Sequence, residues 1–146
     1  MKSRTLKIVS VSISLVVVVL VSFIYISGVA MSRAESVQCA NNMISIGFGA
    51  RLWANDRVEL MPTNFICMSN ELVTPKVLHC RTDRAHASVN SWEEFSDEKS
   101  SYLMVSPGSK EGTTNVVFIR CRIHRHLGFP DGSVTDAGRT KVFRKS

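Results

Sequence analysis

The chain has 146 residues, of which 18 are Lys or Arg and 12 are Asp or Glu, so its formal net charge is +6. Three of the basic residues precede residue 8, which leaves 15 basic side chains against 12 acidic ones in the rest of the chain. An excess this small does not indicate a nucleic-acid-binding protein. About 115 residues follow the apolar run that ends at residue 31, enough for one small domain.

Residues 8–31 form an uncharged apolar run, IVSVSISLVVVVLVSFIYISGVAM. About 20 apolar residues in a helix span the hydrocarbon core of a bilayer, and a helix pairs its own backbone groups within lipid. Lys2, Arg4 and Lys7 precede the run, and such positive charge favours a cytoplasmic N-terminus. We therefore predict a single-pass membrane protein with a cytoplasmic segment at 1–7, a transmembrane helix at 8–31 and an extracytoplasmic domain at 32–146.

A cleaved secretory signal is the alternative, since Gly28-Val29-Ala30 offers small residues at the end of the run. The apolar core of a signal peptide has roughly 7–15 residues, and this run is longer. The length favours an anchor that is retained.

Residues 32–57 have a helical pattern that continues the anchor. Apolar residues recur along one stripe and a neighbouring row, namely Val37, Ala40, Ile44 and Phe48, then Met43, Ile46, Ala50 and Trp53. We expect Ile44 and Phe48 to pack against a strand at 115–122, and we expect Pro62 to end the helix. Gly47 and Gly49 weaken the helix by up to ~1 kcal/mol each relative to Ala.

The rest of the chain predicts short elements. Residues 70–78 suggest a helical turn or loop before a short strand that reaches Cys80, and residues 81–99 suggest a polar loop with a helical turn near Trp92. Strands are expected at 101–105, 115–122, 127–129, 133–135 and 140–143, with a hairpin turn at Pro130-Asp131-Gly132. The predicted fold class is α+β: a long N-terminal helix, membrane-spanning and then amphipathic, packed on a small antiparallel β-sheet.

The strand at 115–122 alternates apolar and basic residues. Val117, Ile119, Cys121 and Ile123 are expected on one face, and Arg120, Arg122 and His124 on the other. Extended by the next two residues, the basic face would contain Arg120, Arg122, His124, Arg125 and His126. It is either an ordinary solvated sheet face or a surface for an anionic partner such as lipid headgroups or acidic polysaccharide. Few aromatic residues lie nearby for base stacking, so no nucleic-acid partner is expected.

All four cysteines, Cys39, Cys67, Cys80 and Cys121, follow the anchor. An oxidising compartment permits disulfides, and four cysteines allow three pairings. We predict at least one intramolecular disulfide, with Cys80–Cys121 as the first candidate pair and Cys39–Cys80 as the second.

No metal, cofactor or catalytic residue is assigned. The pattern Cys121-x-x-His124-x-His126 and the pair His79-Cys80 contain zinc-type ligands, but their spacing matches no paired cluster, and Cys121 and His124 are expected on opposite strand faces. Asp131, Ser133 and Asp136 offer an incomplete oxygen set for Ca²⁺. Zinc and calcium are therefore minor alternatives. A Cys–His nucleophile would need a third group that the sequence does not identify, which predicts a non-enzymatic protein.

Three segments match motifs of a known family. Residues 39–47, CANNMISIG, resemble a Cys-x-Asn-Asn-Leu-x-x-Ile-Gly segment, and residues 68–83 resemble the approach to a Cys-Pro-x-Asp segment. Residues 121–134 are similar to a closing His…Asp-Gly-Ser-Val element. The matches run in order over residues 35–135, and together they resemble bacterial prepilin-type pseudopilins, which belong to the type IV pilin-like family. The resemblance implies a pilin-like fold in a component of a type II secretion or type IV pilus-type system, with other pseudopilin or secretion-apparatus subunits as partners. It also implies the bacterial inner membrane and a periplasmic domain.

The chain departs from that family at the start of the apolar run. Prepilins have a glycine at this junction and a glutamate within the run, and residues 7–11, KIVSV, have neither. We therefore expect an uncleaved anchor. The leading hypothesis is a non-enzymatic pseudopilin-like component, and the alternative is a tethered extracytoplasmic module that binds an anionic ligand on its basic sheet face.

Overall fold

The computed structural model describes the backbone of residues 2–137 and 139–143 and the side chains of residues 13–137. The chain divides into two compact units, Met1–Glu35 and Ser36–Ser146. Helix α1 (Lys2–Asn55) supplies the first unit and continues into the second.

The first unit is a helix with an apolar surface. Its most apolar window has a mean hydropathy of 2.6, and none of that window is buried. Phe23 and Ile24 are each 70% exposed. The prediction of an apolar helix long enough to cross a membrane is confirmed, and this helix is compatible with a membrane anchor.

The second unit contains an antiparallel sheet in which each strand pairs with the next along the chain. The strands are β1 (Tyr102–Met104), β2 (Ile119–Cys121), β3 (His126–Gly128), β4 (Val134–Asp136) and β5 (Arg139–Phe143). Tyr102 pairs with Cys121 across β1 and β2. The turn between β3 and β4 forms as expected, because Gly132 adopts a φ of 82° and its N–H donates to the Phe129 carbonyl at 2.9 Å. The α+β class and the small antiparallel sheet are confirmed.

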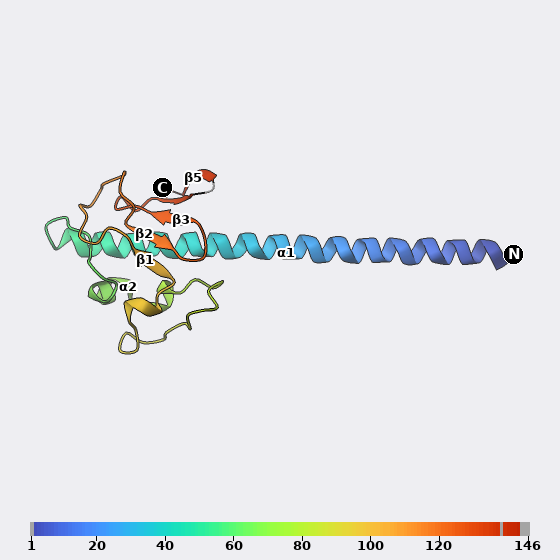
Figure 1. Cartoon of the computed structure of the whole chain (residues 1–146), viewed down its shortest axis with the longest axis horizontal. Helices are drawn as coiled ribbons and strands as arrows, with labels where there is room; N and C mark the ends of the chain where they lie inside the picture. Colours follow the sequence, from blue (N-terminus) through green and yellow to red (C-terminus); the bar gives the residue numbers. More distant parts are fainter. Residues whose placement is uncertain (1, 138, 144–146) are drawn as a thin grey trace. The chain divides into compact units, whose positions relative to one another are not determined.

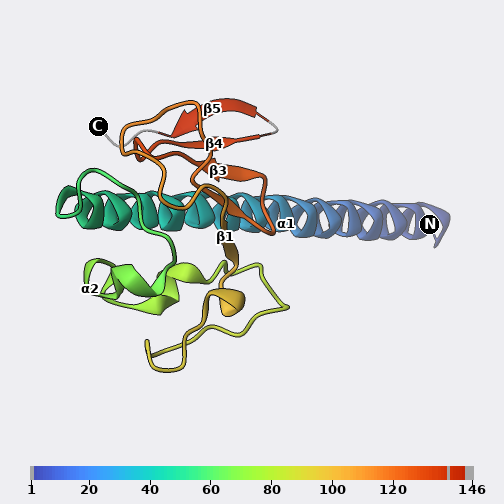
Figure 2. The same ribbon diagram turned by 60° about the vertical axis from the view of Figure 1, so that its left-hand side comes forward.

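Within this unit, strands β3 to β5 lie on one side of the Ser36–Asn55 segment, and α2 (Ser69–Leu72) lies on the other (Figures 1 and 2). The segment is buried along one face, which consists of Cys39, Ala40, Met43, Ile46, Ala50 and Ala54. We call these residues the inner face. Tyr102, Phe118 and Ile119 of the sheet region are buried in the same core.

The predicted orientation of the helix was partly wrong. Phe48 is 62% exposed and Val37 is 52% exposed, although both were expected in the core. Ile44 is only partly buried. Because the helix turns 100° per residue, Met43, Ile46 and Ala50 centre the buried stripe on the opposite side from Phe48. The two rows expected from the sequence do not form a single core-facing surface.

The glycines of this segment permit close packing. A Cβ atom on Gly49 would lie 2.7 Å from Leu72 Cδ2, and one on Gly47 would lie 3.5 Å from the Gly132 Cα. Gly49 therefore allows the segment after the helix to approach its backbone closely.

Helix α1 ends at Asn55, seven residues before Pro62, which was expected to end it. Val58 and Glu59 adopt left-handed conformations, with φ of 55° and 60°, and the Glu59 N–H donates to the Ala54 carbonyl at 3.1 Å. The helix therefore stops because the chain reverses and caps its last turn.

The middle segment is less regular than expected. It contains α2 and the 3₁₀ turns η1 (Ile66–Met68), η2 (Pro75–Leu78) and η3 (Asp97–Lys99). The strand expected before Cys80 is replaced by η2, and the helical turn expected near Trp92 occurs at η3 instead. Trp92 packs edge-on against Phe95 at a centroid distance of 5.3 Å.

Candidate metal centre and apolar groove

Four side chains that could bind a metal converge in the second unit: Cys39, Cys80, Cys121 and His124. One ligand atom from each lies within 4.8 Å of the other three. The three cysteines are buried and His124 is half-buried. We call these four residues the thiol cluster.

Four separate positions in the fold supply the cluster. Cys39 lies on the inner face of α1, and Cys80 follows η2 closely. The Cys80 N–H donates to Ser101 Oγ at 2.9 Å, which holds this segment beside β1. Cys121 is the last residue of β2, and His124 follows in the bend before β3. The site therefore depends on the packing of helix, loop and sheet.

Several polar groups surround the sulfur atoms. The N–H groups of Ile123 and His124 donate to Cys121 Sγ at 3.4 Å and 3.3 Å. The Tyr102 hydroxyl donates to Cys39 Sγ at 3.7 Å. His124 Nδ1 lies 3.4 Å from Cys80 Sγ and 4.0 Å from Cys121 Sγ. Each of the three sulfur atoms therefore has a polar neighbour outside the group of thiols.

Hydrogen bonds among the thiols shift the pKa values of Cys39 and Cys80 in opposite directions. Hydrogen bonds with Cys121 and then Cys39 lower the pKa of Cys80, whose sulfur accepts them. Hydrogen bonds with Cys121 and then Cys80 raise the pKa of Cys39, and burial raises it further. Burial also raises the pKa of Tyr102, so its hydroxyl stays protonated and remains a donor. Among the three thiols, Cys80 therefore loses its proton most readily.

The predicted disulfide is not formed, because all four cysteines are free. The candidate pairs Cys80–Cys121 and Cys39–Cys80 are nevertheless neighbours in the thiol cluster. Cys67 lies outside it, and its thiol donates to the Asn64 carbonyl at 3.0 Å. The three cysteines named as disulfide candidates therefore lie together, but no disulfide joins them.

Cys121 and His124 do not lie on opposite faces of a strand, as the alternation had predicted. Strand β2 ends at Cys121, so the alternation stops there, and the bend brings His124 Nδ1 back toward the cysteine. The Cys-x-x-His spacing was a signal for this arrangement, but Cys39 and Cys80 could be added only from the tertiary fold.

Two of the residues considered for calcium, Asp131 and Ser133, are hydrogen-bonded to each other. Asp131 Oδ1 accepts hydrogen bonds from the Ser133 N–H and hydroxyl, at 2.9 Å and 2.6 Å, and so stabilises the turn. Asp136 lies in β4, where it pairs with His126. Among residues 13–137, the thiol cluster is the one group of His, Cys, Asp or Glu side chains that could hold a metal.

The predicted basic surface is only partly present. Arg120, Arg122 and Arg125 are exposed, but His126 is only 2% exposed. His126 Nε2 lies 3.3 Å from Ser36 Oγ, and its ring stacks on His124 at 5.4 Å. Burial, and then the neighbouring His124, lower the pKa of His126. The surface therefore consists of three arginines without the two histidines.

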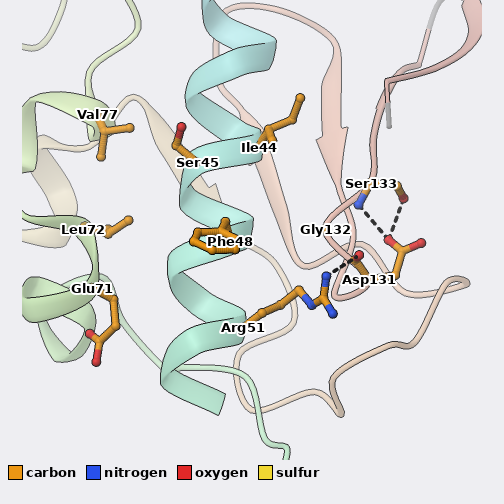
Figure 3. A pocket seen from close by; sticks show the side chains of 10 residues that line it. All are labelled: Ile44, Ser45, Phe48, Arg51, Glu71, Leu72, Val77, Asp131, Gly132 and Ser133. Carbon is orange, nitrogen blue, oxygen red and sulfur yellow. Dashed lines mark hydrogen bonds between the residues drawn. The ribbon is translucent and has the colours of Figure 1, made fainter. Parts of the chain in front are cut away.

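A second feature is a groove of about 500 Å³ beside the exposed side of α1. Figure 3 shows the Phe48 side chain between Leu72 and Val77 on one side and the Asp131–Ser133 turn on the other. At the groove, Arg51 donates to Glu111 Oε1 at 2.8 Å and to the Asp131 carbonyl at 3.4 Å. The groove is apolar where Phe48 lies and polar beside Arg51. The sequence did not predict this groove, because the apolar pattern of the helix placed Phe48 in the core.

No protein-family model matches this chain, and neither a curated protein nor a solved structure is significantly similar to it.

Proposed function

We propose that this chain is a non-enzymatic, pseudopilin-like component of a bacterial type II secretion or type IV pilus-type envelope system. In this proposal the apolar part of α1 anchors it in the inner membrane, with the N-terminus in the cytoplasm and residues 32–146 in the periplasm. The ordered resemblance of residues 35–135 to pseudopilins supports it, as does an anchor helix that continues into an α+β domain.

The observation that carries the proposal is the apolar outer side of α1. Val37, Phe48 and Leu52 are 52%, 62% and 46% exposed. Their spacing of 11 and 4 residues places them on one side of a helix. We call these three residues the outer face. Phe48 and Leu52 lie one turn apart, and exposed apolar residues that lie together on a folded domain often mark a protein contact.

The partner that we propose for the outer face is a neighbouring pilin-like subunit. Phe48 and the apolar wall formed by Leu72 and Val77 offer an anchor residue and a groove on the same surface. Interfaces gain most of their free energy from a few such aromatic residues placed in apolar pockets.

The test is photocrosslinking in native membranes, with a benzophenone amino acid at Phe48. The matched control carries the same group at Arg84, an exposed residue of the polar loop. We expect Phe48 to crosslink to a protein of the envelope apparatus or to a second copy, and Arg84 to give no such product. Equal products at both positions, or none at Phe48, would contradict the proposal.

The alternative function is a tethered module that binds an anionic ligand. The exposure of Arg120, Arg122 and Arg125 supports it. Binding of a soluble acidic polysaccharide to the detergent-solubilised chain distinguishes the two functions, because the apolar helix would enter lipid vesicles in either case. Replacing all three arginines with Gln should abolish this binding if the alternative holds, and should leave the Phe48 crosslink unchanged if the first proposal holds.

A further inference from the structure

The thiol cluster contains the ligand set of a closed zinc site. Cys39, Cys80 and Cys121 supply three sulfur atoms and His124 supplies a ring nitrogen, all within 4.8 Å of one another. Three cysteines and one histidine are a common ligand set of structural zinc. We propose that Cys39, Cys80, Cys121 and His124 bind one Zn²⁺ and that the ion fastens helix α1 to the sheet.

The distances fit a tetrahedral ion. Zn–S bonds of about 2.3 Å and Zn–N bonds of about 2.0–2.1 Å imply ligand separations of about 3.8 Å between sulfurs and about 3.6 Å between sulfur and nitrogen. His124 Nδ1 lies 3.4 Å from Cys80 Sγ and 4.0 Å from Cys121 Sγ. These two separations bracket the ideal value, so small side-chain movements are enough to place an ion at the centre.

The surroundings suit metal-bound thiolates. Neutral sulfur is a weak acceptor, yet two backbone N–H groups point at Cys121 Sγ and the Tyr102 hydroxyl points at Cys39 Sγ. Donors of this kind orient metal ligands and offset the charge of a thiolate. The stacked ring of His126 also holds the plane of His124. Hydrogen-bond donors that can support zinc-bound thiolates therefore lie beside Cys121 and Cys39.

Zinc uses all four groups, whereas a disulfide uses two. A bond between two sulfurs at about 2.0 Å would leave the third cysteine and His124 without a role. Thiolate ligands also select against Ca²⁺ and Mg²⁺, which prefer oxygen. Because four protein ligands complete the tetrahedron, the site is structural and leaves no position for a substrate.

Zinc would join parts of the fold that are distant in sequence. Cys39 belongs to α1, Cys80 to the segment after η2, and Cys121 and His124 to the end of β2 and the bend that follows. The ion would hold Cys39 of the inner face in place and leave the outer face unobstructed. This role concerns folding and does not depend on the proposed envelope function.

The first experiment measures zinc in the full chain, purified in mild detergent with reductant and without chelator. Mass spectrometry of the metal should find one zinc per chain. Replacing any ligand, in Cys39→Ser, Cys80→Ser, Cys121→Ser or His124→Ala, should lower zinc content by about tenfold or more. The matched control Cys67→Ser should retain full zinc. His124→Cys should also retain it, because four cysteines form an equally good zinc site.

The second experiment uses the parent protein alone, so it does not require any variant to fold. Alkylation followed by mass measurement should modify Cys67 first, and a zinc chelator should expose the other three cysteines. Co²⁺ added to the chelator-treated protein should give the visible absorption of a tetrahedral thiolate site. Protection that only a reductant removes would show a disulfide and overturn the proposal. A parent chain that holds no zinc after reconstitution with reductant present would overturn it as well.

Discussion

The two sides of the Ser36–Asn55 segment contain similar apolar residues and have opposite environments. The inner face, with Met43 and Ile46 at 0% exposure, packs into the core. The outer face, with Phe48 at 62% exposure, borders the groove beside Leu72 and Val77. The comparison shows that apolar character alone does not assign a helical residue to a core. On the inner face such residues stabilise the domain, and on the outer face we propose that they bind a partner.

Replacement of Met43 by Ala tests the inner face and should have the largest effect. Met43 is fully buried, and its Cε would lie 3.3 Å from a Cβ on Gly128. Removing a buried side chain of this size costs about 2–5 kcal/mol in the free energy of unfolding. Urea denaturation of the detergent-solubilised chain, followed by tryptophan fluorescence, measures the change. A cost below about 1 kcal/mol would contradict the burial of this face.

Asp83, in the loop after Cys80, provides a pH-dependent test. Burial raises the pKa of Asp83, but hydrogen bonds from Ser101 and His86 outweigh it and lower the pKa to about 2. Because the folded pKa lies below the unfolded value, this stabilisation is complete above about pH 4 and is lost as pH falls toward about 2. The contribution is on the order of 2 kcal/mol.

Urea denaturation between pH 6 and pH 2 measures this contribution. Asp83→Asn should lower stability at pH 6 and flatten the acid limb of the stability profile. Asp56→Asn is the control, since Asp56 is exposed after the end of α1. It should keep the acid limb of the parent. If the pH dependence of stability were the same in Asp83→Asn as in the parent, the Asp83 carboxylate would not stabilise the folded state.

Replacement of Phe48 by Ala tests the outer face. Because the side chain is mostly exposed, the free energy of unfolding should change by less than about 1 kcal/mol. In membranes, crosslinks formed through a cysteine or photoreactive group at the neighbouring outer-face residue Leu52 should decrease. A loss of stability as large as that of Met43→Ala would place Phe48 in the core and remove the contrast between the two faces.

The ion pair beside the groove should have the smallest effect. Arg51 Nε lies 2.8 Å from Glu111 Oε1, and the Arg51 side chain is 47% exposed. Partly exposed pairs contribute about 0.2–1 kcal/mol. Arg51→Met should therefore cost at most about 1 kcal/mol, with a smaller cost in high salt. Comparison with Glu111→Gln in a double-mutant cycle isolates the pair. A cost independent of salt would assign the effect to packing of the arginine stem.

The sequence alone determined the local features of this protein. An uncharged apolar run predicted a long helix, because backbone hydrogen bonds in a helix are local. Alternating residues predicted a strand at 115–122, of which only Ile119–Cys121 form β2, with Ile119 and Cys121 buried and Arg120 exposed. Pro130-Asp131-Gly132 predicted the hairpin turn. These features depend on residues that are close in the chain. The membrane, its orientation and the partner subunits remain predictions.

Only the tertiary structure decided which helix face is buried and which residues meet. Two apolar rows on α1 were equally acceptable by pattern, and the packing of β1 and β2 selected the row that contains Met43 and Ile46. Cys39 and Cys80 join Cys121 and His124 only because helix, loop and sheet pack together. Contacts of this kind join residues that are about 40 positions apart or more. A periodic pattern relates only residues within one helix or strand, so it cannot predict such contacts.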